Sequence, residues 1–338
     1  MTDYLLLFPI LVSFFVTLFL VPYWIRKAWQ IGLVWDDMNK AKKRKVAGSG
    51  GIAAILGFIS GGLITIAYKV FFIDGAEANL VQTFALISVI LILAGVGLID
   101  DLIGWQHGGL SKRSRMVLIL FAAIPLVVIN AGRSIVNVPL WGNVDLGLLY
   151  PLVFIPLGIV GASTTFNFLA GLNGLEAGQG VILLAGMSLV AYFTGSTWLA
   201  LIGLCMIFSL LAFLIYNYYP AQVFPGDSLT YCVGGLIATI AILGNFEKIA
   251  VFLFIPLGIE TILKLRGGLE KHSFGKPNKD ASLSLKYDKI YSLNHLAIYL
   301  LNKCGVKPTE KRVVWAIWLF EAIWVALVLF IFREGIFR

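Results

Sequence analysis

Charged residues are scarce in this sequence of 338 residues. Asp, Glu, Lys and Arg together make up 13% of the chain, whereas hydrophobic residues make up 59%. A soluble globule of this size needs more polar side chains to cover its surface, so the composition excludes a soluble protein. The mean hydropathy of +0.91 agrees with this and indicates an integral membrane protein.

Cysteines are also few, and the three present, Cys205, Cys232 and Cys304, have no CxxC spacing. This excludes a disulfide framework and a cysteine-rich zinc site, so we interpret them as small packing residues. A cleavable signal is missing as well. The apolar run over residues 5–23 is too long for a signal peptide and lacks a small-residue cleavage site. We interpret this run as the first membrane span.

Long apolar runs, in contrast, recur along the whole chain. A helix needs about 17–25 apolar residues to cross a bilayer. The sequence predicts one all-α integral-membrane domain over residues 1–338. About ten transmembrane helices are expected, at residues 4–25, 50–69, 80–99, 115–132, 146–165, 178–196, 198–217, 229–245, 249–266 and 313–332.

Basic residues are distributed unevenly between the two ends of these spans. Five polar loops alternate onto one face and contain 21 of the 26 Lys and Arg residues: 26–49, 100–115, 166–179, 217–228 and 264–312. By the positive-inside rule these loops are cytoplasmic, and an even number of spans places the N and C termini outside. The net charge of +8 therefore reflects membrane orientation and phosphate-bearing ligands, and nucleic acid is not expected as a partner.

The most unusual of these loops reads Phe-Asn-Phe-Leu-Ala-Gly-Leu-Asn-Gly-Leu-Glu-Ala-Gly-Gln over residues 166–179. It places Asn167, Asn173 and Glu176 between two apolar runs, where a bilayer offers no water to amides or to a carboxylate. Its glycines let the backbone approach a ligand closely. The structural alternative is a helix cap followed by a glycine-rich bend. The residues of the other loops are needed to choose between this alternative and a ligand site.

Acidic residues recur on the same face. Asp100 and Asp101 end the third span, and Asp227 lies in a Phe-Pro-Gly-Asp turn before another. Adjacent carboxylates raise each other's pKa and cost stability unless a cation or strong hydrogen bonds offset them. Mg²⁺ takes one or two carboxylates plus phosphate oxygens, so Asp227 with Asn167 would suffice for a site. An ordinary helix end and an ordinary turn aspartate are the alternatives.

Basic side chains accompany these acids. Lys112 follows the acidic pair, and the longest loop carries Lys271, His272 and Lys276. Acids and amides together with several cations are what a Mg²⁺ ion holding a pyrophosphate requires, because phosphoryl transfer depends on positioned and neutralised oxygens. Residues 48–51, Gly-Ser-Gly-Gly, would offer backbone N–H groups to an anion at the start of a span. A solvated basic loop remains the alternative.

These motifs resemble those of the polyprenyl-phosphate N-acetylhexosamine-1-phosphate transferases. The resemblance is strongest to the dolichyl-phosphate branch that uses UDP-N-acetylglucosamine (UDP-GlcNAc). The stretch 167–179 is highly specific, and the other motifs are weak singly. In the family's order they are Asp-Met-Asn-Lys at 37–40, Ile-Asp-Asp at 99–101, the stretch 167–179, Val-Phe-Pro-Gly-Asp at 223–227 and Lys-His at 271–272.

The resemblance implies a role for each motif. Asn167 and Asp227 look like ligands of Mg²⁺, with Mn²⁺ as the alternative metal. Asp100 and Asp101 look like the acidic pair of the catalytic centre, and Lys112 looks like a pyrophosphate contact. Uracil would lie at Asn173 and Phe224, and sugar or phosphate at Lys271 and His272. The substrate-binding set is Asp36, Asp37, Met38, Asn39, Asn173, Glu176, Phe224, Lys271, His272 and Lys276.

The implied reaction moves GlcNAc 1-phosphate from UDP-GlcNAc to a polyprenyl (dolichyl) phosphate in the membrane and releases UMP, starting a lipid-linked glycan. The sequence departs from the eukaryotic pattern at Gly48 and Ser273, so another UDP-amino sugar is one alternative. A lipid-phosphate transporter or flippase is another. The compact last loop points to a prokaryotic, archaeal plasma membrane. Oligomers are usual for such enzymes, so a homodimer is one expectation.

Overall fold

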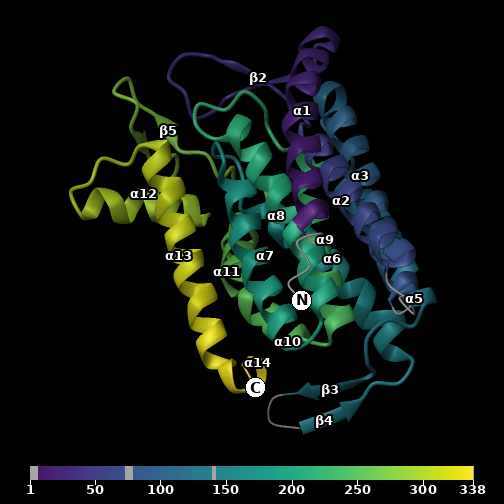
Figure 1. Ribbon diagram of the computed structural model, residues 1–338. Helices are drawn as coiled ribbons and strands as arrows, with labels where there is room; N and C mark the ends of the chain where they lie inside the picture. Colours follow the sequence, from purple (N-terminus) through teal and green to yellow (C-terminus); the bar gives the residue numbers. More distant parts are fainter. Residues whose placement is uncertain (1–6, 73–78, 139–141, 338) are drawn as a thin grey trace.

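The computed structural model describes residues 7–72, 79–138 and 142–337, which are mostly helical (Figure 1). The strands in these ranges are short and form three separate antiparallel hairpins. They are β1 (Val34–Asp36) with β2 (Lys45–Ala47), β3 (Ile135–Val138) with β4 (Gly142–Asp145), and β5 (Lys276–Pro277) with β6 (Leu283–Ser284). The predicted all-α class of a multi-span membrane protein is confirmed.

Within the described residues, eight helices are long and apolar enough to cross a membrane. Helices are expected there because a bilayer offers the backbone no other hydrogen-bond partners. They match eight of the predicted spans: α1 (Leu7–Ile31), α2 (Gly51–Phe72), α3 (Leu80–His107), α6 (Ile155–Phe168) with the π-helical η2 (Tyr150–Phe154) before it, α7 (Leu175–Phe193), α8 (Thr197–Asn217), α9 (Gly226–Gly244) and α13 (Glu310–Ile331).

The other two predicted spans, 115–132 and 249–266, are not single helices, so the prediction of an unbroken helix was wrong there. Pro125 and Pro256 each lie near the start of a second, separate helix. Proline has no N–H to donate, and its ring clashes with the carbonyl four residues earlier, so the preceding helix ends. The resulting pairs are α4 (Lys112–Phe121) with α5 (Ile124–Val128) and α10 (Glu247–Leu253) with α11 (Ile255–Arg266).

The polar loops gather at one end of the helical bundle, which we call the loop end. Figure 1 shows β2, β5 and α12 (Leu293–Lys303) at this end, and β3, β4, α10 and α14 (Arg333–Ile336) at the other. Hydrogen bonds join separate loops here, from Asn39 Nδ2 to the Gly171 carbonyl (2.6 Å) and from Phe224 N to the Ala47 carbonyl (2.8 Å). The loops therefore share a face, as their alternation predicts. The side of the membrane that they face stays a prediction.

At the loop end, several helices extend beyond the apolar runs that predicted them. Because α3 continues to His107, Asp100 and Asp101 lie on a helix. Similarly, α6 includes Asn167, and α9 begins at Gly226, so Asp227 lies in its first turn. Side chains on helices are held more rigidly than side chains on loops, which suits residues that must keep a fixed geometry.

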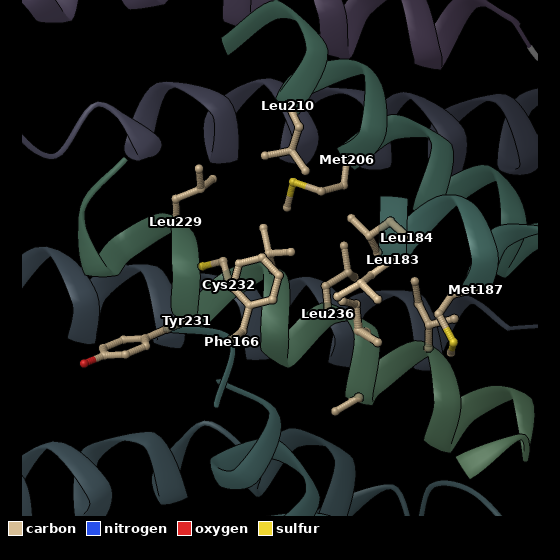
Figure 2. Packing of buried hydrophobic residues seen from close by; sticks show 14 of the residues in the cluster. Phe166, Leu183, Leu184, Met187, Met206, Leu210, Leu229, Tyr231, Cys232 and Leu236 are labelled. Carbon is tan, nitrogen blue, oxygen red and sulfur yellow. The ribbon is translucent and has the colours of Figure 1, made fainter. Parts of the chain in front are cut away.

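Close packing of α3, α6 and α9 brings these helix ends together. A Cβ atom at Gly97 would lie 2.4 Å from Ser228 Cα, and one at Gly234 would lie 2.4 Å from the Ala162 carbonyl oxygen. Larger residues at these two positions would force the helices apart. Figure 2 shows the apolar cluster around α9, with Tyr231 pointing away from the labelled leucine and methionine side chains.

Candidate active site

Two of the predicted acidic residues meet where the end of α3 lies beside the start of α9. Asp101 Oδ1 accepts a hydrogen bond from the Asp227 backbone N–H (2.8 Å), and Asp101 Oδ2 accepts one from Ser228 N (3.4 Å). The α9 helix has no side-chain cap of its own. A carboxylate satisfies the free N–H groups at a helix start and interacts favourably with the helix dipole. Asp101 therefore caps α9 and fixes Asp227.

Asp100, its neighbour, is buried and pairs with a cation that the sequence reasoning missed. Its Oδ1 accepts a hydrogen bond from Leu110 N (2.8 Å), and its Oδ2 lies 2.6 Å from Arg115 Nε. Lys112, the predicted pyrophosphate contact, is exposed and has no ion-pair partner among the described residues. Arg115 lies three residues further along α4, on the same face of the helix but almost one turn along its axis, and this position brings its guanidinium to Asp100.

Tyr231 lies between Asp100 and Asp227. Its hydroxyl oxygen is 3.2 Å from Asp100 Oδ2 and 3.0 Å from Asp227 Oδ2. A hydroxyl has one hydrogen, so it can donate to one of these carboxylates at a time. Arg115 Nη2 is 3.9 Å from Asp227 Oδ2. We call Asp100, Asp101, Arg115, Asp227 and Tyr231 the acid centre.

The charge of the acid centre is not balanced by protein groups. Among the described residues, Arg115 is the one cation within ion-pair distance of its three carboxylates. The Asp227 side chain is 26% exposed, whereas that of Asp100 is 2% exposed. Three carboxylates with one guanidinium leave surplus negative charge that costs free energy until a cation compensates it. Asp101 and Asp227 are partly exposed, whereas Asp100 is buried, so a cation could approach the first two from solvent.

Asn167, the other predicted metal ligand, lies beside the acid centre. Its Oδ1 accepts a hydrogen bond from the Thr230 hydroxyl (2.9 Å), and the same hydroxyl is 3.3 Å from the Asp227 carbonyl oxygen. One Thr230 side chain therefore links the end of α6 to the first turn of α9. Asn167 and Asp227 lie on the same end of the bundle and within one side chain of each other, as a shared metal site requires.

The oxygen donors of this region fit a hard cation. Among the described residues, no three His, Cys, Asp or Glu side chains converge tightly enough to ligate a metal by themselves. A structural zinc site needs such a closed set of ligands. Mg²⁺ needs only one or two protein oxygens, since water and substrate phosphates complete its shell. Asp227 and Asn167 meet that lower requirement.

The stretch after α6 turns sharply and is held by its own side chains. Gly171 and Gly174 have φ angles of +99° and +86°, which side chains other than glycine rarely adopt. Glu176 Oε1 accepts a hydrogen bond from Gly171 N (2.8 Å), and Gln179 Nε2 donates to the Leu169 carbonyl (3.1 Å). The observed contact of Glu176 is thus with the backbone of this turn. Its predicted contact with substrate stays a prediction.

Two buried amides next to this turn offer unused acceptors. Asn173 Nδ2 donates to Asp37 Oδ2 (3.1 Å), and Asn39 Nδ2 donates to the Gly171 carbonyl (2.6 Å). Asn39 Oδ1 and Asn173 Oδ1 are buried, and neither has a hydrogen-bond partner within the described part of the chain. Burying an amide oxygen without a donor costs free energy, so a ligand that donates hydrogen bonds would be favoured here.

Glu310, the first residue of α13, was also missed by the sequence reasoning. Its Oε1 accepts a hydrogen bond from the Asn173 backbone N–H (2.8 Å), and its Oε2 pairs with Lys40. Lys40 Nζ also lies 3.1 Å from Asp37 Oδ2. We call Asp37, Lys40, Asn173 and Glu310 the Lys40 cluster. In sequence, Glu310 looks like an ordinary acid in the first turn of a helix, where carboxylates are common.

The other predicted residues of the first loop lie on its exposed side. Asp36 and Met38 are exposed, whereas Asp37 and Asn39 are buried. Asp36 ends β1, whereas the other three residues lie in the turn after it, where Asp37 and Asn39 point toward the protein. Asp36 and Met38 therefore have the weaker structural support as substrate contacts.

Phe224 is half-buried, and its backbone rather than its side chain fixes the loop. Its carbonyl accepts a hydrogen bond from Gly50 N, and the Pro225 carbonyl accepts one from Gly51 N, both at 2.9 Å. The N–H groups of Gly50 and Gly51 are thus occupied by protein carbonyls. Gly48 N likewise donates to the Leu33 carbonyl (3.0 Å), so the expectation that residues 48–51 offer backbone N–H groups to an anion was wrong for the three glycines.

The last loop approaches the stretch after α6 through Phe274. A Cβ atom at Gly171 would lie 2.6 Å from Phe274 Cε1. His272 stacks on Phe274, with ring centroids 5.9 Å apart, and Lys271 Nζ lies 5.2 Å from the centre of the Tyr287 ring. Lys276 is exposed in β5. The structure thus brings His272 close to the turn, whereas Lys276 lies on the outer hairpin.

Two buried residues outside the predicted set hold this loop. Glu260 Oε2 accepts a hydrogen bond from Leu293 N (2.6 Å) and so caps α12. His295 Nδ1 accepts from Tyr291 N (3.3 Å), and its Nε2 lies 3.2 Å from the Phe274 carbonyl. Since a carbonyl only accepts, Nε2 carries the proton and the ring is neutral. Burial accordingly lowers the pKa of His295.

The pKa of His272 is lowered as well. Partial loss of hydration is the main cause, and the ammonium groups of Lys286 and Lys264 add to it. Both effects disfavour the imidazolium. Near neutral pH, His272 is therefore a neutral hydrogen-bonding group rather than a cation.

An apolar groove of about 680 Å³ runs along α6, α9, α10 and α11. Gly158, Gly161 and Thr165 line it on α6, Ala238 lines it on α9 and Ala250 lines it on α10. Thr165 lies two residues before Asn167, which is about 3 Å along the axis of α6. One end of the groove therefore lies at about the height of the acid centre, although the two side chains leave the helix on different sides.

Comparison with known proteins identifies the family. The sequence profile of glycosyl transferase family 4 matches residues 83–245. Proteins provisionally named UDP-N-acetylglucosamine–dolichyl-phosphate N-acetylglucosaminephosphotransferase are similar to this chain in Saccharolobus solfataricus (37% identity over 325 residues, 95% of each chain) and Sulfolobus acidocaldarius (32% over 324 residues, 95% of this chain and 94% of the relative).

A more distant relative is the phospho-N-acetylmuramoyl-pentapeptide-transferase of Staphylococcus carnosus. It is 29% identical over 267 residues, which cover 75% of this chain and 80% of the relative. The matched profile includes most of α3 and all of α6 and α9, which carry the acidic residues of the acid centre and Asn167. From its similarity over nearly the whole length to the archaeal proteins, the chain belongs to glycosyl transferase family 4.

Proposed function

We propose that this protein transfers GlcNAc 1-phosphate from UDP-GlcNAc to a polyprenyl phosphate, with dolichyl phosphate as the first choice, and releases UMP. One observation carries the proposal: a single segment borders a lipid-sized groove at Thr165, the acid centre at Asn167 and the buried amides at Asn173. A transfer between a nucleotide and a lipid needs these three sites next to each other. The archaeal relatives are named for this activity.

The buried amides suit the uridine end of the donor. The N3–H group of uracil donates a hydrogen bond, and the free Oδ1 atoms of Asn173 and Asn39 are acceptors. Phe224 is half-buried at the same loop end, and its ring would offer a face for stacking on the base. A site that hydrogen-bonds one edge of a base rejects bases lacking that donor, because its buried acceptors would then lack partners.

The acid centre would bind the metal and the pyrophosphate. Asp227 and Asn167 are the residues that would hold Mg²⁺, with Mn²⁺ as the alternative. When bound, the cation neutralises phosphate oxygens so that two anionic substrates can approach each other. Arg115 adds a fixed positive charge at the same place. Guanidinium groups bind phosphate oxygens well because their planar N–H groups match that geometry.

The chemical step exchanges one P–O bond for another. An oxygen of the lipid phosphate bonds to the phosphorus that bears the sugar, and UMP leaves with the electron pair of the broken bond. The lipid phosphate is already largely deprotonated at neutral pH, so the step needs positioning more than a base. Asp101 caps α9 and Asp100 pairs with Arg115. We therefore assign both carboxylates to positioning Asp227 and Arg115.

The isoprenoid chain of the acceptor would lie in the apolar groove. Its phosphate would then reach the acid centre past Thr165, at the loop end of α6. The concentration of basic residues in the five polar loops supports the cytoplasmic side as the location of this end. With relatives in Saccharolobus and Sulfolobus, the membrane would be an archaeal plasma membrane.

The amino sugar of the donor is the part of this proposal with a direct rival. The Staphylococcus relative is named for a phospho-N-acetylmuramoyl-pentapeptide rather than for GlcNAc. A panel of UDP-amino sugars, assayed for UMP release, separates the two readings. Faster release from another UDP-amino sugar would replace GlcNAc in the proposal and leave the reaction type unchanged.

A reconstitution experiment tests the reaction. Purified protein is mixed with UDP-GlcNAc, a polyprenyl phosphate and Mg²⁺, and the lipid product is identified by its mass. The proposal predicts a lipid heavier by one GlcNAc phosphate and an equal amount of UMP. In sealed vesicles, movement of lipid phosphate across the bilayer with no change in the nucleotide sugar would contradict the proposal and support a transporter.

A further inference from the structure

The Lys40 cluster connects three segments that are far apart in the sequence. Asp37 and Lys40 come from the loop after α1, Asn173 from the turn after α6, and Glu310 from the start of α13. The side chains are largely buried, with exposed fractions of 2% for Asp37, 3% for Glu310 and 15% for Lys40. Charges at this depth must be paired, because unpaired ones would carry a large desolvation cost.

Asn173 is held from two sides by this cluster. Glu310 Oε1 accepts its backbone N–H (2.8 Å), and Asp37 Oδ2 accepts its side-chain Nδ2 (3.1 Å). Carboxylates only accept hydrogen bonds, so both must face N–H groups, and the amide oxygen of Asn173 has to point elsewhere. This fixes the direction of the free Oδ1 atom. Neither acid alone would fix both the backbone and the side chain.

Lys40 links the two acids. Its ammonium pairs with Glu310 Oε2 and lies 3.1 Å from Asp37 Oδ2 and 4.3 Å from the centre of the Tyr219 ring. With the ammonium removed, two buried carboxylates would face the same asparagine without a cation between them. Their repulsion would then move the residues that hold Asn173.

We propose that Glu310 and Lys40 are positioning residues for the nucleotide donor, acting through Asn173. The inference rests on the proposed function for the identity of the ligand, a uridine nucleotide. In this arrangement α13 takes part in donor binding, although no hydrogen bond or ion pair among the described residues joins an α13 side chain to the acid centre. Loss of either residue should weaken nucleotide binding and leave the binding of the lipid phosphate unchanged.

The test measures binding of UMP to the detergent-purified full-length protein by calorimetry, with the KM values for UDP-GlcNAc and polyprenyl phosphate measured alongside. We expect E310A to raise the Kd for UMP and the KM for UDP-GlcNAc by at least tenfold. We expect kcat and the KM for the lipid phosphate to change less than threefold. E310Q keeps an acceptor for Asn173 N but loses the charge, so its effect should be smaller. K40M should resemble E310A.

Glu321 provides the matched control. It lies on the same helix as Glu310 and is similarly buried (1% exposed), but neither of its carboxyl oxygens has a hydrogen-bond partner among the described residues. E321Q removes a buried acid from α13 without touching Asn173. It should leave the Kd for UMP at the wild-type value. A general disturbance of α13 would instead raise this Kd in E321Q as well.

The outcomes separate this inference from the proposed function. Wild-type Kd values for UMP in both E310A and K40M would overturn it, even with normal GlcNAc phosphate transfer. Equal rises in both KM values would also overturn it, because they indicate general distortion. If wild-type protein binds UMP but transfers nothing, the proposed reaction fails and the variants still decide this inference. A wild type that does not bind UMP overturns both. If E310A does not fold, the Kd values for UMP of E310Q and K40M decide whether the inference holds.

Discussion

Two groups of buried carboxylates lie at the loop end, and they differ in how their charge is balanced. In the Lys40 cluster, two carboxylates share one ammonium and two N–H groups of Asn173, with side chains at most 15% exposed. In the acid centre, three carboxylates share one guanidinium, and Asp227 is 26% exposed. The same residue types therefore form one closed network and one open network.

The difference indicates separate tasks for the two groups. A closed network of buried charges rigidifies the groups that it contacts, and it has little charge left for a ligand. An open network with surplus negative charge is costly on its own, and a bound cation removes that cost. The Lys40 cluster therefore suits positioning, and the acid centre suits binding of a metal and its phosphates.

Replacing the exposed acid of the open network should have the largest effect. We expect D227A to lower transfer by about a thousandfold, a loss comparable to the removal of a preorganised electrostatic group in other enzymes. UMP release from UDP-GlcNAc with Mg²⁺ measures this directly. E334Q, which changes an exposed acid of α14, serves as the control and should keep wild-type activity. Near-normal UMP release by D227A would contradict the assignment.

The cation of the open network provides the next test. R115M should lower kcat/KM by about 100-fold, because it removes the fixed positive charge beside Asp100 and Asp227. K112M should change kcat/KM by less than about threefold, since Lys112 is exposed and Arg115 occupies the predicted place. A larger loss in K112M than in R115M would restore the assignment made from the sequence.

Filling the groove should raise the KM for the lipid acceptor and leave both carboxylate networks unchanged. A Cβ atom at Gly161 meets no atom within 4 Å, so G161L places its side chain in the groove without a clash at Cβ. We expect the KM for a long-chain polyprenyl phosphate to rise about tenfold, equivalent to about 1.4 kcal/mol, while the KM for UDP-GlcNAc stays constant. G95L on α3, where a Cβ also meets no atom within 4 Å, is the matched control. Equal KM values in both variants would exclude the groove as the acceptor site.

The smallest expected effect concerns pH and His272. Its pKa is lowered in the folded loop, so the fold favours neutral imidazole. This contribution to stability is present above the unfolded pKa of about 6.5 and is lost as the pH falls through the folded value. The thermal unfolding temperature of wild type should therefore fall relative to that of H272Q on acidification. K276Q should follow wild type, and a constant difference between wild type and H272Q would contradict the shift.

Much of the fold and the location of the site could be predicted from the sequence. Long apolar runs require helices in a bilayer, and their alternation places the polar loops at one end. The breaks at Pro125 and Pro256 were visible in the sequence but were overlooked, because the surrounding runs are as apolar as a span requires. Asn167, Asp227 and Asn173 stood out because polar groups between apolar runs need a specific reason.

The residues that were missed depend on tertiary geometry. Choosing Arg115 over Lys112 requires knowing where α4 begins and how far along its axis Asp100 lies, because residues three apart share one face of a helix. Glu310 is remote from every motif in the sequence and gains its role only where α13 meets the turn after α6. Gly50 and Gly51 looked free to bind an anion, since nothing in the sequence places the Phe224 and Pro225 carbonyls against them.

Direct binding of Mn²⁺, followed by electron paramagnetic resonance on the purified protein with UMP present, tests the central claim most directly. The account predicts one Mn²⁺ per chain that Mg²⁺ displaces. D227N should lose this ion at the same concentrations, and E321Q should retain it. Wild-type Mn²⁺ binding in D227N would contradict a metal site at the acid centre.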